Sequence, residues 1–305
     1  MIKKLATNIP LLGILLSLSG ATFFALSIVT ARWSYDFNTN TQTVMLFRFT
    51  CIIGIMLFWI RKRKLQLLIP PKDALKSSVL GIFYFIGIGS YLASVAFMPV
   101  GLAVLILYTF PILVILGSAL LDKRKPSLLE FSALVIAFIG LFIALDINTD
   151  STKPIGILLA TLAALGVTIN MLGSANILKR VEFPIFSLYQ ALIITIISAL
   201  FVIFTGGIAF PDSPKGWLIL MVMLISFIIA YISVYTSLRV IGAVRTSTIM
   251  NLEPIMTIIF AIALLQEQMT IEKFIGGIIV LFAILLAQLP QIRTLFKPKT
   301  SRENI

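Results

Sequence analysis

Long apolar stretches alternate with short polar segments along the whole of this chain. A helix needs roughly 20 mostly apolar residues to cross the hydrocarbon core of a bilayer, which is roughly 30 Å thick. Ten stretches reach this length, with approximate bounds 10–31, 42–60, 77–98, 101–121, 128–146, 155–178, 184–206, 216–238, 241–264 and 271–289. We therefore predict an all-α integral membrane protein with ten transmembrane helices.

Two of the junctions between these stretches are very short, at Met98-Pro99-Val100 and at Arg239-Val240-Ile241. At either junction the two stretches could form one long helix, which would lower the count. Proline costs a helix interior about 3 kcal/mol, because it lacks a backbone donor and its ring collides with the preceding turn. Pro99 therefore favours a break at the first junction.

The composition indicates a bilayer environment. Hydrophobic residues make up 59% of the 305 residues and charged residues only 12%, and the mean hydropathy is +1.09. A soluble domain carries roughly 25% charged residues, so too few ionic groups remain here to cover a water-facing surface. The net charge of +12 is divided among short clusters between apolar runs, such as Arg61-Lys62-Arg63-Lys64. Without a basic stripe along one polar face, a nucleic-acid partner is not expected.

Two residue types needed for common catalytic and metal sites are scarce. The chain contains no histidine, and its single cysteine, Cys51, lies inside an apolar stretch. No disulfide can form within the chain. Zinc sites built on histidine and Ser-His-Asp triads are excluded. We therefore expect no enzymatic activity, no metal site and no cofactor.

The distribution of lysine and arginine predicts the orientation, because cytoplasmic segments are enriched in these residues. With a cytoplasmic N-terminus, 19 of them fall in cytoplasmic segments and four in external ones, while Arg48 lies inside a span. The apolar run after Lys3 and Lys4 exceeds the roughly 7–15 residues of a signal-peptide core, which favours an uncleaved first helix. Ten spans then return the basic C-terminus to the cytoplasm. We predict a multi-pass protein of the cytoplasmic membrane with both termini cytoplasmic.

The two halves of the chain resemble each other when they are aligned with Pro111 on Pro254. In this alignment, which we call the repeat register, Gly13-Ile14-Leu15-Leu16 falls on the identical segment at 156–159. Small residues at intervals of four also recur in the first span of each half. A fourfold identity together with the matched prolines favours a true repeat over a chance match between apolar helices.

Each half contains five predicted spans, so the second half would lie upside down in the bilayer relative to the first. The charges agree with this inversion, because the basic cluster 123–125 corresponds to the acidic, external segment 266–268. We predict two inverted five-helix repeats, at 1–150 and 151–305. Inverted repeats are common in secondary transporters, which move two similar halves around a site near the middle of the membrane.

Motifs in both halves add a family resemblance. They are 91–101 (YLASVAFMPVG) and 108–111 (YTFP) in the first half, and 251–255 (NLEPI), 265–271 (LQEQMTI) and Gly276-Gly277 in the second. Together with Arg48-Phe49 in the second span, they resemble EamA-type permeases of the drug/metabolite transporter superfamily. The resemblance covers nearly the whole chain and implies a transporter with a 5+5 inverted topology. One departure is Asp122-Lys123-Arg124-Lys125, where the family often has a Gly-Glu pair.

Glu253 is the acidic residue that lies near the centre of a predicted span. An ionised carboxylate at that depth costs about 2.5–3.5 kcal/mol on insertion scales, so such a residue normally faces a cavity or a partner. It could carry a proton or contact a ligand, or it could bond backbone groups loosened beside Pro254. Its presence in a motif shared across many substrates favours the structural role.

Three further residues in the spans have two interpretations each. Arg48 lies seven residues into the second span, roughly 10 Å from its outer end. It could extend outward as an anchor, or face the pathway and attract a carboxylate. Pro111 and Pro254 each free the carbonyl four residues earlier, on Leu107 and Met250. These kinks could serve gating and substrate binding, although neighbouring groups often satisfy such carbonyls in membrane helices.

The remaining polar residues within the spans are neutral. Polar groups are costly against lipid, and transporter sites form where repeats meet, so we expect these residues to face one central cavity. Hydrogen bonding between helices is their alternative use. A cavity with so few charges suits an amphipathic metabolite better than a nucleotide, which needs Arg or Lys clamps. The neutral polar residues are Tyr91, Tyr108, Asn170, Gln190, Tyr231, Tyr235 and Asn251, and all of them except Gln190 are the candidates for the cavity lining.

These observations predict a secondary transporter that moves a small metabolite by alternating access. An amino acid or a related compound is the preferred substrate. An exporter of amphipathic drugs and a flippase for a lipid-linked substrate are alternatives within the transporter class. A passive channel is the alternative from another class, although channels usually build pores from several subunits or rings of charge. The expected partners are the lipid bilayer and the substrate, and the chain could act as a monomer or a homodimer.

Overall fold

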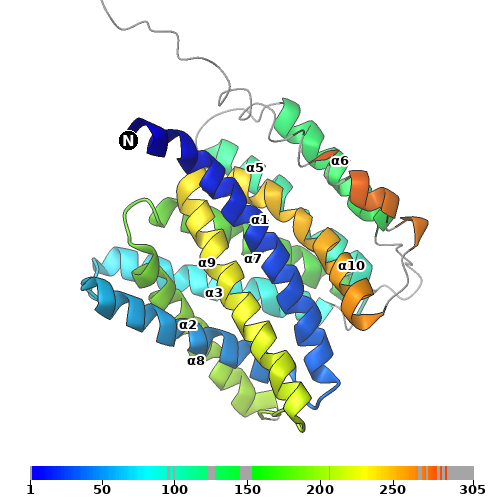
Figure 1. Cartoon of the computed structure of the whole chain (residues 1–305), viewed down its shortest axis with the longest axis horizontal. Helices are drawn as coiled ribbons and strands as arrows, with labels where there is room; N and C mark the ends of the chain where they lie inside the picture. The colour runs from blue at the N-terminus through cyan, green and yellow to red at the C-terminus, as the bar shows by residue number, and fades with distance from the viewer. Residues whose placement is uncertain are drawn as a thin grey trace, which may run out of the picture.

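The computed structural model describes residues 2–94, 97–98, 100–121, 128–144, 153–205, 207–266, 270–272, 274–279, 282–283 and 286. Within these ranges the regular structure is entirely α-helical (Figure 1). The helices are α1 (Ile2–Tyr35), α2 (Thr41–Arg63), α3 (Pro71–Ser94), α4 (Val100–Leu107), α5 (Phe110–Leu121), α6 (Leu128–Ala144), α7 (Pro154–Ile177), α8 (Phe183–Thr205), α9 (Pro214–Met250) and α10 (Leu252–Leu265). The all-α class is confirmed.

Six helices are long and apolar enough to cross a membrane, namely α1 from Pro10 onward, α2, α3, α7, α8 and α9. Shorter apolar helices occupy Phe110–Leu121, Phe131–Gly140 and Leu252–Leu264. Six clear apolar spans are thus established among the described residues. The total of ten transmembrane helices stays a prediction, because the described parts of the fourth, fifth, ninth and tenth stretches lie in shorter helical pieces.

The fourth stretch is divided into two helices in front of a proline, and a second helix boundary precedes a proline in the ninth stretch. α4 ends at Leu107 and α5 begins at Phe110, just before Pro111. In the second half, α9 ends at Met250 and α10 begins at Leu252, shortly before Pro254. Proline weakens the turn before it, because it cannot donate a backbone hydrogen bond there. The two boundaries correspond to each other in the repeat register.

α9 also turns sharply at Gly242, where φ is 79° and ψ is 172°. Glycine adopts this conformation because it has no Cβ atom to collide with the backbone. This turn divides α9 beside the short junction Arg239-Val240-Ile241. The part before the turn contains the eighth predicted stretch, and the part from Ala243 onward belongs to the ninth. The equivalent position in the first half is Pro99, which lies outside the described residues.

The two halves pack against each other through exchanged pairs of helices, α1 with α9, α3 with α7, and α2 with α8. Figure 1 shows α1 running beside α9. A Cβ atom on Gly20 would lie 3.6 Å from the carbonyl oxygen of Ala230, and one on Gly87 would lie 3.4 Å from that of Ala163. Small residues permit such close backbone contact. The repeat register relates Gly20 to Ala163 and Gly87 to Ala230, so the two crossings are copies of each other.

Segments that the charge pattern places outside the cell contact one another. The backbone N–H of Asp212 donates to the carbonyl of Phe37 at 3.3 Å, and the N–H of Lys153 donates to that of Phe97 at 2.9 Å. Each bond joins a loop of the first half to a loop of the second. These contacts agree with helices that cross the bilayer in alternating directions.

Segments assigned to the cytoplasm also contact one another, through two ion pairs. Arg180 lies 2.9 Å from Asp73, and Arg239 lies 2.9 Å from Glu182. The guanidinium of Arg239 holds the pKa of the Glu182 carboxyl below its ordinary value by hydrogen bonding. The basic cluster 123–125 and Glu267 lie outside the described residues. Which face of the bundle meets the cytoplasm stays a prediction from the charges.

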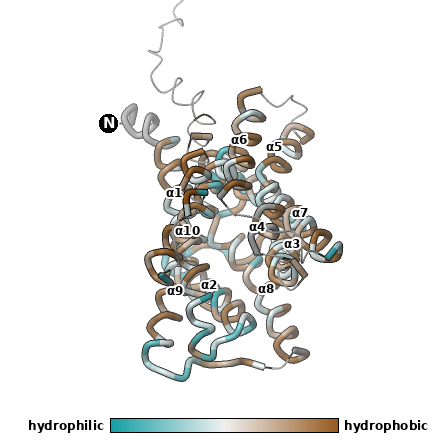
Figure 2. The backbone as a smooth tube through the Cα atoms, turned by 90° about the vertical axis from the view of Figure 1, so that its right-hand side faces the viewer, coloured by the Kyte–Doolittle hydropathy of each residue, from teal (hydrophilic) through white to brown (hydrophobic). Residues whose placement is uncertain are grey.

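The outer surface of the bundle is apolar. Phe204 is 83% exposed, and Phe58 and Leu120 are also largely exposed. Soluble proteins rarely expose contiguous apolar surface of this extent, so these side chains face lipid. Figure 2 shows hydrophilic residues mainly in the connecting segments at the ends of the bundle.

α6 lies at the edge of the bundle beside the helical residues 274–279 (Figure 1). A Cβ atom on Gly140 would lie 2.9 Å from the carbonyl oxygen of Gly276, so the two backbones are in close contact. These segments are the fifth and tenth of the predicted spans. The remaining helices therefore form the part of the fold that surrounds the site.

Candidate functional site: a central cavity between the two halves

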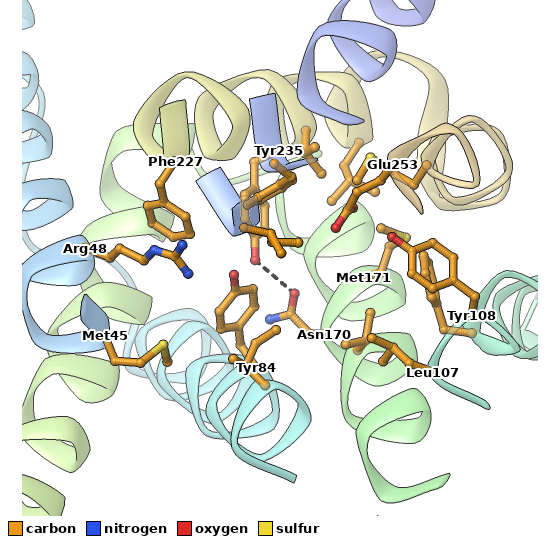
Figure 3. A pocket seen from close by; sticks show the side chains of 18 of the residues that line it. Met45, Arg48, Tyr84, Leu107, Tyr108, Asn170, Met171, Phe227, Tyr235 and Glu253 are labelled. Atoms are coloured by element: carbon orange, nitrogen blue, oxygen red, sulfur yellow. Dashed lines mark hydrogen bonds between the residues drawn. The ribbon is translucent and has the colours of Figure 1, made fainter. Parts of the chain in front are cut away.

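A cavity of about 150 Å³ lies where helices of both halves meet. The first half contributes α1, α2, α3 and the junction of α4 with α5, and the second half contributes α7, α9 and α10. Most of the lining is aliphatic or aromatic (Figure 3). The side chains with polar groups are Arg48, Tyr84, Tyr108, Asn170, Tyr235 and Glu253.

The lining reflects the internal repeat. Several lining residues correspond to each other in the repeat register, so both halves present the same positions to the cavity. The two charged residues break this symmetry, because Arg48 corresponds to Ala191 and Glu253 corresponds to Phe110. The equivalent pairs are Phe24 with Val167, Ile28 with Met171, Tyr84 with Phe227, Leu107 with Met250, and Phe110 with Glu253.

Arg48 lies on α2 and directs its guanidinium group toward the cavity (Figure 3). Its Nη2 donates to the hydroxyl of Ser27 at 2.8 Å and to the carbonyl of Ser27 at 3.3 Å, and its Nε donates to Sδ of Met223 at 3.2 Å. The Cζ atom lies 4.8 Å from the ring centre of Phe227, within the range of a cation–π interaction. No carboxylate of the described residues forms an ion pair with Arg48. A charge of this kind inside a membrane protein marks a candidate site for an anionic group.

Glu253 lies in the first turn of α10, immediately before Pro254. Its carboxyl group faces the cavity and points toward the Tyr108 hydroxyl (Figure 3). Tyr108 belongs to the turn between α4 and α5. The helix boundaries before Pro111 and Pro254 thus bring Tyr108 and Glu253 together at the cavity wall. The positive end of the α10 dipole also favours a carboxylate at this position.

Neutral hydrogen-bonding groups lie between the two charges. The Tyr235 hydroxyl donates to Oδ1 of Asn170 at 2.9 Å, and Nδ2 of Asn170 donates to the carbonyl of Leu80 at 2.8 Å. These bonds join α9, α7 and α3. The Tyr84 hydroxyl points toward the middle of the cavity (Figure 3).

Arg48 and Glu253 face the cavity from opposite sides (Figure 3). The site therefore offers a cation, a carboxyl group, three tyrosine hydroxyl groups, an amide and a largely apolar wall. Among the described residues, no group of three or more His, Cys, Asp or Glu side chains could hold a metal ion. These groups can bind and orient a small solute that combines charged, polar and apolar parts.

Five of the residues expected at the site line the cavity, and three do not. Arg48, Tyr108, Asn170, Tyr235 and Glu253 lie in the lining. The prolines at 111 and 254 lie at the helix boundaries beside it. Tyr91, Tyr231 and Asn251 have other surroundings. A role in transport for any of these residues stays a prediction.

The three residues outside the lining are held by packing or hydrogen bonds elsewhere. Tyr231 is fully buried and donates to Oε1 of Gln190 at 2.7 Å, which joins α9 to α8. Tyr91 packs against the small cluster that contains Met98 and Ala160. Asn251 lies buried at the junction of α9 and α10, and its Nδ2 has no partner among the described residues. The face of its helix on which a side chain lies decides whether it reaches the cavity.

Tyr84 and Phe227 are cavity residues that sequence reasoning missed. Tyr84 presents its hydroxyl to the cavity, and Phe227 supports the guanidinium of Arg48. The repeat contained a usable signal, because these two aromatic residues correspond to each other in the repeat register.

The EamA-like transporter family matches residues 11–145 and 154–289, so both halves match. Protein PagO of Salmonella typhimurium is 32% identical over 149 residues, which cover 48% of this chain and 47% of PagO. The chain therefore spans about half the length of that relative in the alignment.

Two relatives align over almost their entire length. One is described as the uncharacterized transporter YcbK of Bacillus subtilis, with 23% identity over 92% of this chain and 94% of YcbK. The other is described as the uncharacterized transporter sll1319 of Synechocystis, with 21% identity over 99% of both chains. A solved crystal structure with 17% identity superposes with a TM-score of 0.76, covering 93% of this chain and 99% of the other. That likeness concerns the fold.

Proposed function

The chain belongs to the EamA-like transporter family, and we propose that it is a permease that moves an amino acid or a related zwitterion across the cytoplasmic membrane. The proposal rests on one observation. One cavity between the two halves has on one side an arginine that forms no ion pair with a carboxylate of the described residues, and on the other side a carboxyl group. A zwitterion complements this arrangement.

The charges define how such a solute would bind. Arginine donates to carboxylates through charge-assisted, often bidentate hydrogen bonds, so Arg48 would bind the carboxylate of the solute. Glu253, supported by Tyr108, would face the ammonium group. Tyr84 and the Asn170 amide would complete the polar contacts between them. The aromatic and aliphatic lining would then contact the side chain of the solute, which favours apolar amino acids.

The repeat supports alternating access as the transport mechanism. The crossings of α1 with α9 and of α7 with α3 are equivalent in the repeat register, as expected for two halves of one inverted-repeat transporter. Such transporters expose a site between the repeats first to one side and then to the other. We propose that the halves are inverted in the membrane and that both termini are cytoplasmic.

Uptake by the purified protein in proteoliposomes tests the proposal. The panel contains labelled apolar amino acids, amines that lack the carboxylate, and amphipathic cationic drugs, each measured with and without a pH gradient. We expect uptake or exchange of apolar amino acids above that of protein-free liposomes. Transport of the cationic drugs alone would contradict the amino-acid assignment and favour the drug-exporter alternative.

A further inference from the structure

A second cavity lies between α2, α3, α7 and α8. Its volume is about 530 Å³, larger than the 150 Å³ of the central cavity. Its lining includes Thr41 on α2, Gly89 on α3 and Ser198 on α8, each in the half of its helix that the charge pattern places toward the outside. Met45 lines both cavities, so one side chain forms part of the wall between them.

Two equivalent positions on the opposite side of the bundle carry larger side chains. In the repeat register, Gly89 corresponds to Ile232 and Ser198 corresponds to Ile55. Both isoleucines pack against the main hydrophobic core. A small residue on the outer side is thus replaced by a large one on the cytoplasmic side at two equivalent positions. The second cavity is thus lined by small residues at two positions whose equivalents on the opposite side carry bulky side chains.

Ser198, in the lining of the second cavity, has a hydroxyl group whose hydrogen bonding is incomplete. Its side chain is 3% exposed, and its hydroxyl oxygen has no hydrogen-bond partner among the described residues. Buried hydroxyl groups in folded proteins almost always have a partner. A polar group in the second cavity would supply the missing bond.

From these observations we infer that the second cavity is an access vestibule, a separate binding site between the outer membrane face and the central cavity. The inference rests on the proposed function, because the solute is the one that the permease transports. It is an amphipathic solute, with its apolar part against Phe85 and Leu159 and a polar group at Ser198. Displacement of the Met45 side chain then opens the path to Arg48.

Filling the vestibule tests this inference. A Cβ atom on Gly89 would meet no heavy atom within 4 Å, so Gly89→Leu places a side chain in the second cavity without a clash. Gly54→Leu is the matched control, because Gly54 is an exposed helical glycine on α2 with equally open space. Both substitutions are made in a chain with Cys51→Ala and Met45→Cys. The readout is the rate at which a charged, membrane-impermeant thiol reagent modifies position 45 from outside in proteoliposomes of known orientation.

We expect modification from outside, slowed about tenfold or more by Gly89→Leu because a close-packed barrier excludes the reagent. Gly54→Leu should leave the rate unchanged. Equal rates in the two leucine variants, modification from the cytoplasmic side alone, or no modification would each overturn the inference. Melting temperatures confirm that both variants are folded. The readout needs no substrate, so failure of the uptake panel would overturn the proposed function and leave the vestibule supported.

Discussion

Replacing Arg48 with glutamine should weaken recognition of the carboxylate of the solute. The substitution removes the positive charge from the cavity and retains a polar side chain on α2. It also removes the cation–π contact with Phe227, 4.8 Å from the guanidinium carbon, and weakens the hydrogen bonds to Ser27. Some loss of stability is therefore expected, and the assay must separate that loss from the loss of recognition.

The magnitude follows from the bonds that the substitution removes. Hydrogen bonds to a charged group contribute about 1.5–3 kcal/mol. At about 1.4 kcal/mol per factor of ten, the dissociation constant of an amino acid should rise about 10- to 150-fold. A ligand without a carboxylate should bind the variant about as well as the unmodified protein, because it has no group that bonds to Arg48.

The assay compares three ligands that share one apolar part, namely leucine, 3-methylbutylamine without the carboxylate, and 4-methylpentanoate without the amine. Binding to detergent-purified protein is measured by calorimetry below the melting temperature of each variant. Arg63→Gln is the matched control, because Arg63 lies on the same helix at its exposed end, over the ring of Trp59. Glu253→Gln is the reciprocal variant and should weaken leucine and the amine while sparing the acid.

The comparison within each variant cancels any general loss of stability. An Arg48→Gln variant that weakens leucine and 3-methylbutylamine equally would refute the carboxylate assignment, since the loss would then be structural. A Glu253→Gln variant that binds all three ligands normally would assign Glu253 the structural role beside Pro254 that the sequence favours.

Four further predictions test the fold. Gly242→Ala should lower the free energy of unfolding by about 1–3 kcal/mol, because alanine is strained at φ 79°; a melting temperature equal to that of the Gly54→Ala control would contradict this. Tyr235→Phe should cost about 1 kcal/mol through the lost bond to Asn170, whereas Tyr189→Phe, which loses an exposed bond, should be nearly neutral in the same melts. Arg239 lowers the pKa of the half-exposed Glu182, so the ion pair should stabilise the fold by less than about 1 kcal/mol at pH values above the ordinary carboxyl pKa. This stabilisation should be lost as the pH falls through the lowered pKa of Glu182. Arg239→Gln should flatten this part of the profile of stability against pH, and an unchanged profile would count against the pair. Single cysteines introduced at Lys153 and Lys215 in a Cys51→Ala background should react with an impermeant thiol reagent from outside, those at Lys72 and Lys123 should not, and the reverse pattern would refute the proposed topology.

The sequence predicts the helices well because the bilayer fixes their length and apolar character. The predicted stretch 42–60 lies within α2 (Thr41–Arg63), and 155–178 nearly coincides with α7 (Pro154–Ile177). The prolines at 111 and 254 predict weakened helices, but the extent of each break depends on the packing around it. The turn at Gly242 likewise depends on a backbone conformation that composition does not specify.

The cavity was only partly predictable, for a physical reason. Arg48 and Glu253 stand out because a charge inside an apolar span is costly and therefore rare. Tyr231 and Tyr235 have the same chemistry and lie one helical turn apart, yet one bonds Gln190 on α8 and the other lines the cavity. Side-chain direction relative to neighbouring helices separates them, and that is a property of the tertiary structure.

Ligand protection of a cysteine in the cavity tests most directly the claim that the solute binds between the two halves. Ile88 on α3 lines the central cavity, whereas Ile82 on the same helix is 37% exposed on the bundle surface and lines neither cavity. Each is replaced by cysteine in a Cys51→Ala background, and alkylation by a membrane-permeant maleimide is timed with and without saturating leucine or the best substrate of the uptake panel. We expect the ligand to slow alkylation at position 88 and to leave position 82 unchanged. Equal rates at position 88 with and without a ligand that the protein transports would contradict the account.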